Sequence, residues 1–198
     1  MPFHNPTAGL EVICGPMFSG KSEELIRRLR RARIARQRVQ VFKPRIDDRY
    51  AADRIVSHSE QSLEALVVRD VEDIRKRLDD RTEVIGIDEV QFFDRTIVDL
   101  CERQANMGRR VIVAGLDLDY RGVPFDPVPQ LMAIAEYVTK TLAVCHRCGA
   151  PASRTQRIVA SEERIVVGAL DAYEARCRRC FEPDLPSQLA MDLAGERE

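Results

Sequence analysis

The sequence predicts an α/β fold in which helices flank a parallel sheet and a small cysteine-bearing lobe follows. Short apolar segments alternate with longer helix-like segments, a glycine-rich turn follows the first apolar segment, and two C-x2-C pairs lie near the carboxyl end. Alternating strands and helices are typical of a parallel sheet covered on both faces. We expect an α/β domain over residues 1–138, a cysteine lobe over 139–183 and a mobile tail over 184–198.

Four β-branched segments are bounded by charged or turn residues, as buried strands are. They are LEVIC (10–14), RVQVFK (38–43), EVIGI (83–87) and RVIVAGL (110–116). The segment AEYVTKTLAVC (135–145) is expected to be a last core strand that runs into the cysteine lobe.

Helices are predicted between these strands, over residues 19–35, 71–78 and 94–107. The last of them carries one apolar face, and Gly108 provides a stop signal at its end. That face consists of Ile97, Leu100, Cys101 and Gln104.

The chain has 198 residues, which is long enough to form one well-buried core. Its 44% hydrophobic and 32% charged residues are typical of a globular protein. Lys and Arg number 31 against 32 Asp and Glu, for a net charge of -1. That balance provides no general basic surface for nucleic acid and no polybasic membrane signal. No apolar segment approaches the roughly 20 residues that span a bilayer. The opening MPFHNPTAGL lacks the basic and apolar regions of a secretory signal, so we expect a cytoplasmic protein.

The segment GPMFSGKS, from Gly15 to Ser22, fits the pattern G-x-x-x-x-G-K-[ST] at every fixed position. Glycines let backbone N–H groups surround a phosphate, and the following helix directs its positive end at that anion. Lys21 would contact the β- and γ-phosphates, and the Ser22 hydroxyl would join the Mg²⁺ shell. An ordinary strand-to-helix turn is the alternative. The flanking strand and helix favour a P-loop NTPase-like domain.

Seven arginines lie between Arg27 and Arg38. A nucleic-acid patch is one interpretation. The balanced net charge favours a helix surface that faces solvent or another subunit.

Asp88 and Glu89 directly follow a predicted buried strand. An Asp at such a strand end holds Mg²⁺ in P-loop proteins. Glu89 is expected to point the other way, where it can act as a general base on an attacking hydroxyl. A helix cap or turn is the alternative for both acids. The residues alone leave open whether the hydroxyl is water or a substrate alcohol.

Two cysteine pairs, Cys145 with Cys148 and Cys177 with Cys180, are separated by 28 residues. Four thiolates make a closed tetrahedral zinc site, so the zinc would be structural and the loop between the pairs would be anchored at both ends. Substitution of His146 as a ligand and oxidation to disulfides are the alternatives. Cys14 and Cys101 are expected to be buried core thiols.

Four motifs together, GPMFSGKSEEL, DEVQFF, RIVVGALDAYEARCRRC and the two cysteine pairs, resemble the zinc-containing thymidine kinases of the cellular and bacterial type. The resemblance runs from about Leu10 to Phe181. It implies transfer of the γ-phosphate of ATP to the 5′-hydroxyl of thymidine, with deoxyuridine as a conceivable second substrate. Glu89 would accept the proton, the zinc-anchored loop would close over the nucleoside as a lasso, and four chains would form a homotetramer.

The resemblance also assigns contacts to individual residues. ATP would be bound by Gly15, Pro16, Met17, Phe18, Ser19, Gly20, Lys21, Ser22, Asp47, Asp48, Arg49, Asp88, Glu89, Val90 and Gln91, with Ser22 and Asp88 as Mg²⁺ ligands. The nucleoside would be bound by Met17, Phe92, Leu116, Tyr120, Phe125, Thr155, Arg164, Ile165, Val166, Val167, Gly168 and Tyr173. Two departures are mild: the family often has a second glycine at Ala169 and Phe at Tyr120.

Two other functions remain compatible with the sequence. A P-loop ATPase would use Glu89 to activate water and would keep the zinc lobe for a partner. A nonenzymatic zinc-ribbon protein would bind nucleic acid, but the intact Lys21, Ser22 and acid pair, together with the net charge, count against it.

Overall fold

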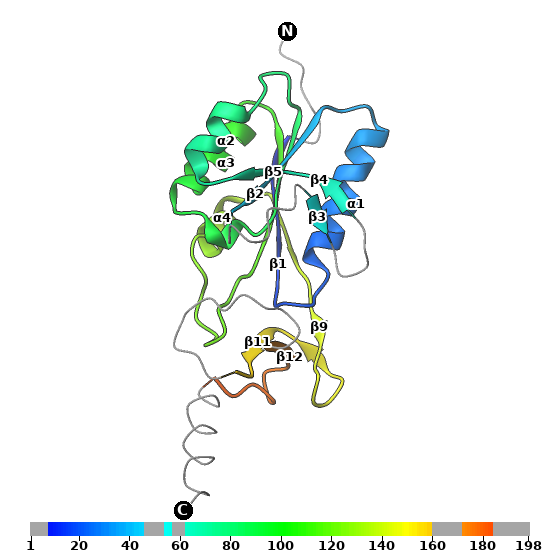
Figure 1. Ribbon diagram of the computed structural model, residues 1–198, viewed down its shortest axis with the longest axis vertical. Helices are drawn as coiled ribbons and strands as arrows, with labels where there is room; N and C mark the ends of the chain where they lie inside the picture. The colour runs from blue at the N-terminus through cyan, green and yellow to red at the C-terminus, as the bar shows by residue number, and fades with distance from the viewer. Residues whose placement is uncertain (1–7, 46–53, 57–61, 160–171, 184–198) are drawn as a thin grey trace, which may run out of the picture.

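In the computed structural model, which describes residues 8–45, 54–56, 62–159 and 172–183, a six-stranded sheet forms the centre of the molecule (Figure 1). Its order is β5-β2-β6-β7-β1-β8, and every neighbouring pair is parallel. The strands are β1 (Gly9–Cys14), β2 (Val39–Pro44), β5 (Leu66–Val68), β6 (Val84–Ile87), β7 (Arg110–Gly115) and β8 (Tyr137–Lys140). The predicted α/β fold with a parallel sheet is confirmed.

Helices cover both faces of this sheet. Helix α1 (Lys21–Ile34) lies on one face, and α2 (Val71–Arg77), α3 (Thr96–Asn106) and α4 (Val128–Ile134) lie on the other (Figure 1). Because side chains of a strand alternate between faces, Val12 packs in the core under α2, α3 and α4 whereas Ile13 packs under α1. The predicted apolar face of α3 is buried as expected. Cys14 and Cys101 are buried thiols, also as expected, and burial raises the pKa of Cys101 to about 12.

The last core strand is shorter than predicted. Strand β8 ends at Lys140, and a separate strand, β9 (Ala143–Val144), begins three residues later. Beyond Lys140, the Thr141 N–H still donates to the Cys14 carbonyl at 2.8 Å, which holds the chain beside the glycine-rich turn. Strand β5 and helix α4 were not anticipated; a strand of three residues is too short to show a clear alternation.

The cysteine lobe lies beyond the carboxyl end of β1 (Figure 1). Two antiparallel pairs form it: β9 with β10 (Pro151–Ala152), and β11 (Arg154–Arg157) with β12 (Tyr173–Arg176). The His146 N–H donates to the Ala175 carbonyl at 2.9 Å and joins the two pairs. A third hairpin, β3 (Arg54–Val56) with β4 (Ser62–Glu64), belongs to the α/β part of the chain. Among the described residues, none of the helices is both long enough and apolar enough to cross a membrane.

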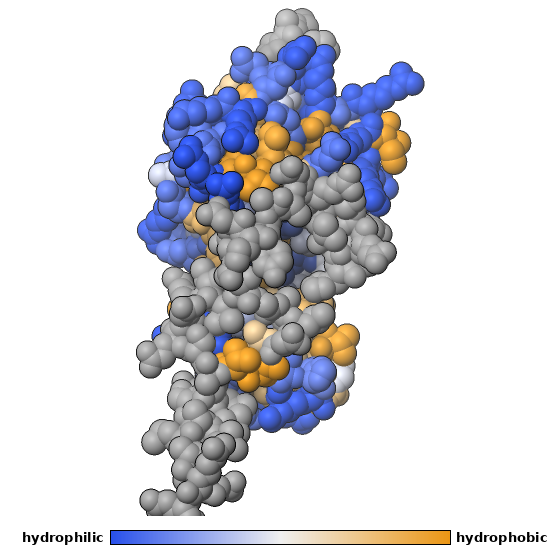
Figure 2. Space-filling view, viewed as in Figure 1, coloured by the Kyte–Doolittle hydropathy of each residue, from blue (hydrophilic) through white to orange (hydrophobic). Residues whose placement is uncertain are grey.

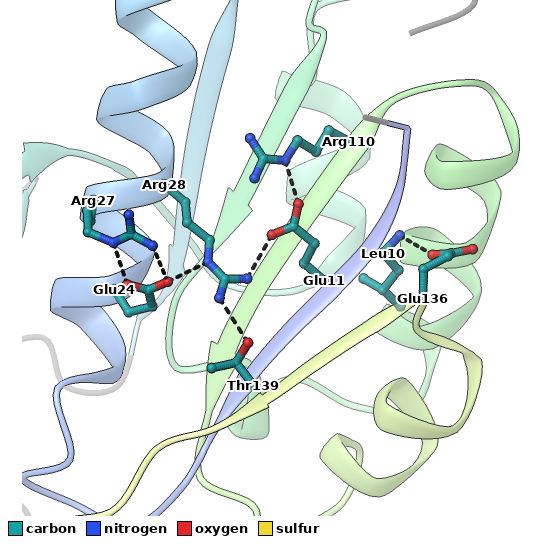
Figure 3. A network of polar contacts seen from close by, with 8 residues as sticks. All are labelled: Leu10, Glu11, Glu24, Arg27, Arg28, Arg110, Glu136 and Thr139. Carbon is teal, nitrogen blue, oxygen red and sulfur yellow. Dashed lines mark hydrogen bonds and ion pairs between the residues drawn. The ribbon is translucent and has the colours of Figure 1, made fainter. Parts of the chain in front are cut away.

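A polar network joins α1 to the sheet (Figure 3). Arg28 donates to Glu11 on β1 at 2.7 Å, to Glu24 on its own helix at 2.7 Å, and to Thr139 on β8 at 2.9 Å. Glu11 also accepts a hydrogen bond from Arg110 on β7 at 2.5 Å. One of the seven arginines predicted to lie on a surface is therefore a packing residue.

Candidate active site

The glycine-rich turn from Gly15 to Ser22 joins β1 to α1. Gly15 has φ 146°, and a Cβ atom there would lie 2.3 Å from the Thr141 carbonyl oxygen, so a side chain is excluded. Gly20 has φ 79° and occupies the N-cap position of α1, which begins at Lys21. The turn therefore ends at the N-terminus of a 14-residue helix. The free N–H groups and the positive end of the helix dipole favour an anion there.

Lys21 lies across the turn. Its Nζ donates to the Pro16 carbonyl at 2.7 Å, and Ser19 Oγ donates to the same oxygen at 2.7 Å. Burial lowers the pKa of Lys21, while the negative charges of Glu89 and Asp88 oppose that shift. The charges of both predicted acids therefore act on the ammonium group, whose hydrogen-bond acceptor is the Pro16 carbonyl.

Ser22 and Asp88 are brought together as predicted. Ser22 Oγ donates to Asp88 Oδ1 at 3.3 Å, and the Glu89 N–H donates to the same oxygen at 3.0 Å. Burial, and then the nearby charge of Glu89, raises the pKa of Asp88 to about 7. A hydroxyl and a carboxylate are hard oxygen donors, so this pair fits a Mg²⁺ ion.

Glu89, which follows Asp88, has an unusual backbone conformation. Glu89 has φ 51° and ψ 41°, a left-handed conformation that is uncommon for a residue with a side chain and that gathers at functional sites. The short 3₁₀ helix η2 (Val90–Phe92) follows directly. Glu89 is therefore not part of a regular strand, so the strand alternation on which the prediction was based does not apply to it.

Gln91 holds the Glu89 carboxylate in place. Its Nε2 donates to Glu89 Oε2 at 2.6 Å, and its Oε1 accepts from the Leu116 N–H at 3.0 Å. The side chain is buried, as is that of Val90, which packs in the core. Gln91 therefore connects the acid after β6 to the end of β7.

Asp117 is a candidate functional residue that sequence reasoning missed. It follows β7 and is 5% exposed, and its carboxylate forms an ion pair with Lys140 Nζ at 2.6 Å. Burial and then the negative charge of Asp117 raise the pKa of Cys14, the residue before the glycine-rich turn, to about 11. The available signal was the one used for Asp88, an acid directly after a buried strand.

The predicted nucleoside residues form two groups in the structure. Tyr120 and Tyr173 are buried together with Met17 packed against them, and the Met17 N–H donates to Thr155 Oγ1 at 3.0 Å. Phe92 and Phe125 make an edge-to-face pair with ring centroids 6.1 Å apart and planes at 82°. Leu116 is half-buried between η2 and the loop that carries Tyr120. The buried Arg157, which sequence reasoning did not single out, contacts both tyrosines.

Two predicted groups lie outside the described residues. They are Asp47, Asp48 and Arg49, and the lasso residues Arg164, Ile165, Val166, Val167 and Gly168.

The four cysteines of the two pairs converge. The Sγ atoms of Cys145, Cys148, Cys177 and Cys180 all lie within 4.8 Å of one another. Cys148 Sγ is 3.7 Å from Cys177 Sγ and 3.6 Å from Cys180 Sγ. Zinc–sulfur bonds of about 2.3 Å place tetrahedral sulfurs about 3.8 Å apart, whereas disulfide sulfurs are about 2.05 Å apart. The cluster therefore fits a zinc ion. The exposed His146 side chain instead faces Glu174, at 3.8 Å.

Two comparisons with known proteins agree with this geometry. The family model described as thymidine kinase matches residues 8–181. A curated protein from Rhodothermus sp. (strain ITI 518), named "Thymidine kinase", is 59% identical over 185 residues, which cover 93% of this chain and 86% of the relative. The matched span includes the glycine-rich turn, the acid pair and all four clustered cysteines, so the chain belongs to the thymidine kinase family.

Proposed function

We propose that the chain transfers the γ-phosphate of ATP to the 5′-hydroxyl of thymidine, giving thymidine monophosphate and ADP in nucleotide salvage. The observation that carries this proposal is the Glu89 carboxylate, which is held by Gln91 and directly follows Asp88, the acceptor of Ser22 in the glycine-rich turn. That arrangement puts a base next to a phosphate-binding turn in a member of the thymidine kinase family.

Phosphate binding would be divided among the turn, Lys21 and the end of α1. A loose phosphoryl-transfer transition state spreads negative charge over the γ-phosphate oxygens, so the protein contributes mainly position and positive charge. Backbone N–H groups from Gly15 to Ser22 would surround the phosphates, and Lys21 would move from the Pro16 carbonyl to the β- and γ-phosphates. Mg²⁺ held by Ser22 and Asp88 would neutralise further charge on the same oxygens when bound.

Glu89 would act as the general base. A carboxylate accepts a proton from an alcohol efficiently only within hydrogen-bond reach, so its orientation matters as much as its basicity. The hydrogen bond from Gln91 and the left-handed backbone both restrict that orientation. Glu89 would take the 5′-hydroxyl proton as the oxygen attacks phosphorus and ADP leaves.

The nucleoside would lie against the two aromatic groups. Met17, Tyr120, Tyr173 and Thr155 would form one wall, and Phe92, Phe125 and Leu116 the other. Residues 164–168 would bind the thymine edge through their backbone, because a buried polar group without its partner costs about 1–3 kcal/mol and so discriminates between bases. Asp47, Asp48 and Arg49 would complete the ATP site, together with the backbone of Val90 and Gln91.

The cysteine cluster would hold one structural zinc ion. It would anchor the ends of the loop between Cys148 and Cys177, within a lobe that spans 139–183 and is distinct from the 1–138 domain. Four reduced cysteines are usual in a reducing compartment, which supports a cytoplasmic location.

A homotetramer is the proposed assembly. Support comes from apolar side chains on β8, the last strand of the sheet, where Tyr137 is 66% exposed and Val138 is 43% exposed. Edge strands with exposed apolar residues are usually covered in the native assembly. Figure 2 shows a further apolar area in the middle of its view, over the region where Figure 1 has the opposite edge strand β5, on which Leu66 is 39% exposed.

The alternative, an ATPase with a zinc module, would use the same turn and acids on water. It leaves the aromatic walls beside the turn without a role, so the kinase is favoured.

A nucleoside panel tests the proposal. The purified chain with MgATP should release ADP rapidly when thymidine is added and slowly without a nucleoside, and thymidine monophosphate should accumulate in equal amount. The panel also measures substrate breadth, with deoxyuridine as the first comparison and the purine nucleosides as controls. ADP release that no nucleoside stimulates, without any thymidine monophosphate, would favour the ATPase.

A further inference from the structure

Arg157 is an arginine buried between two tyrosines. It ends strand β11, and its exposed fraction is 0%. Its guanidinium carbon lies 3.5 Å from the centroid of the Tyr120 ring and 5.4 Å from that of the Tyr173 ring. Its Nη2 also donates to the Tyr173 hydroxyl at 2.9 Å. The same side chain therefore contacts both rings.

Those two rings come from different parts of the chain. Tyr120 lies in the loop between β7 and α4, whereas Tyr173 begins β12 in the cysteine lobe. Arg157 and Tyr173 are directly opposite each other in the antiparallel pair, so their side chains share a face of that hairpin. Met17 and Phe18 of the glycine-rich turn pack against the same tyrosines. Arg157 consequently joins the lobe to the β7–α4 loop, and the phosphate-binding turn packs against the two rings that it contacts.

A guanidinium group is well suited to this place. It is planar, so it can stack flat on one ring while its N–H groups donate in its own plane to another partner. Lysine carries the same charge but has no such plane. Moving a charged guanidinium out of water costs free energy, so contacts such as those with the two tyrosines are needed to offset that cost.

We propose that Arg157 is a positioning residue for the nucleoside: it fixes Tyr120 and Tyr173 as one wall of the thymidine site. This inference rests on the proposed function, since both tyrosines are proposed nucleoside contacts. Arg157 is buried and contacts both rings, so we take its effect on the nucleoside to be exerted through them. Its loss should weaken thymidine binding and leave ATP binding to the turn unchanged.

The first experiment compares three variants by steady-state kinetics. Arg157→Met should raise the KM for thymidine by about tenfold or more with a smaller change in kcat, the pattern for lost ground-state binding. The KM for ATP and the zinc content should stay at wild-type values. Arg157→Lys should recover only part of the loss. Arg154→Met is the control: Arg154 lies three residues earlier on β11, on the other face, and its change should leave the thymidine KM unaltered.

A double-mutant cycle then tests whether Arg157 acts through Tyr173. Tyr173→Phe removes the hydroxyl that accepts from Arg157 and keeps the ring. If the two residues act together, Arg157→Met should raise the thymidine KM much less in the Tyr173→Phe background than in the wild type. If Arg157→Met does not accumulate as zinc-loaded protein, the Arg157→Lys variant is used in the same cycle.

The outcomes separate the two proposals. An unchanged thymidine KM in a folded Arg157 variant, equal losses for both substrates, or strict additivity with Tyr173→Phe would overturn the positioning role alone. A wild-type chain that does not phosphorylate thymidine would overturn the proposed function and this inference with it.

Discussion

At the scale of residues, two adjacent carboxylates have different surroundings. Asp88 is buried against Ser22, whereas Glu89 is partly exposed and held by Gln91. The sequence predicted the position of the pair, because acids after a buried strand are a recognisable pattern. It did not predict the left-handed backbone of Glu89, nor Asp117 and Arg157, since their partners are distant in the chain and only folding brings them together.

Gln91→Met should lower kcat by roughly tenfold or more with little change in the KM for ATP, because Glu89 loses the donor that orients it. The unfolding free energy should also fall by about 1–3 kcal/mol, since the Leu116 N–H loses its buried acceptor. Steady-state kinetics and urea unfolding check both effects. Gln104→Met is the matched control: Gln104, near the end of α3, is also buried and accepts from Arg109 just after that helix, so its loss should lower stability but leave kcat intact. Equal kcat losses in both variants would remove the special role of Gln91.

At the scale of elements, α1 carries both the phosphate-binding end and a polar contact with the sheet. The sequence predicted this helix over residues 19–35, within two residues of its observed start and one of its end. The inward-facing Arg28 was not predicted, because nothing in a run of arginines distinguishes one that packs against the sheet from those that face solvent. Its partners Glu11 and Thr139 lie on two other strands (Figure 3).

This network makes stability depend on acid pH. The hydrogen bond from Arg27, assisted by Arg28, lowers the pKa of Glu24 from 4.5 to about 2. The unfolded chain therefore binds more protons between these values, so the stabilisation is present above about pH 4.5 and is lost as the pH falls toward 2. Urea unfolding at pH 5 and pH 3 should show a smaller drop for Glu24→Gln than for the wild type. Glu102→Gln, on the exposed face of α3, should behave like the wild type. Identical drops in all three proteins would contradict this assignment.

The cysteine lobe should depend on its metal. Cys148→Ser should reduce zinc from about one ion per chain to much less, because a hydroxyl is a poor replacement for a thiolate ligand. The thymidine KM should rise, since β11 and β12 carry Thr155, Arg157 and Tyr173. Elemental analysis and kinetics measure the two effects. Cys101→Ser, on the buried face of α3, should retain zinc. A fully active wild-type sample without zinc would rule out a structural metal.

At the scale of the whole molecule, strand order brings the site together. Strand β7 lies between β1 and β6, so the turn, Asp117 and the acid pair all leave the same edge of the sheet. The sequence predicted the strands and their parallel direction from their alternation with helices. It could not predict their order, because pairing joins segments that are far apart in the chain and alike in composition. The lobe was predicted from four cysteines, and its contacts with the turn, such as that between Met17 and Thr155, follow only from the folded structure.

The most direct measurement of the central claim is the single-turnover rate of phosphoryl transfer from ATP to thymidine in wild type and Glu89→Gln. Glutamine keeps the size of the side chain and removes its capacity to accept the 5′-hydroxyl proton. The rate should fall by about 10²–10⁴-fold while the ATP dissociation constant stays nearly the same. Glu72→Gln, on the exposed surface of α2, should transfer phosphate at the wild-type rate. An unchanged rate in Glu89→Gln would contradict the account, because the carboxylate held by Gln91 would then have no part in the chemistry.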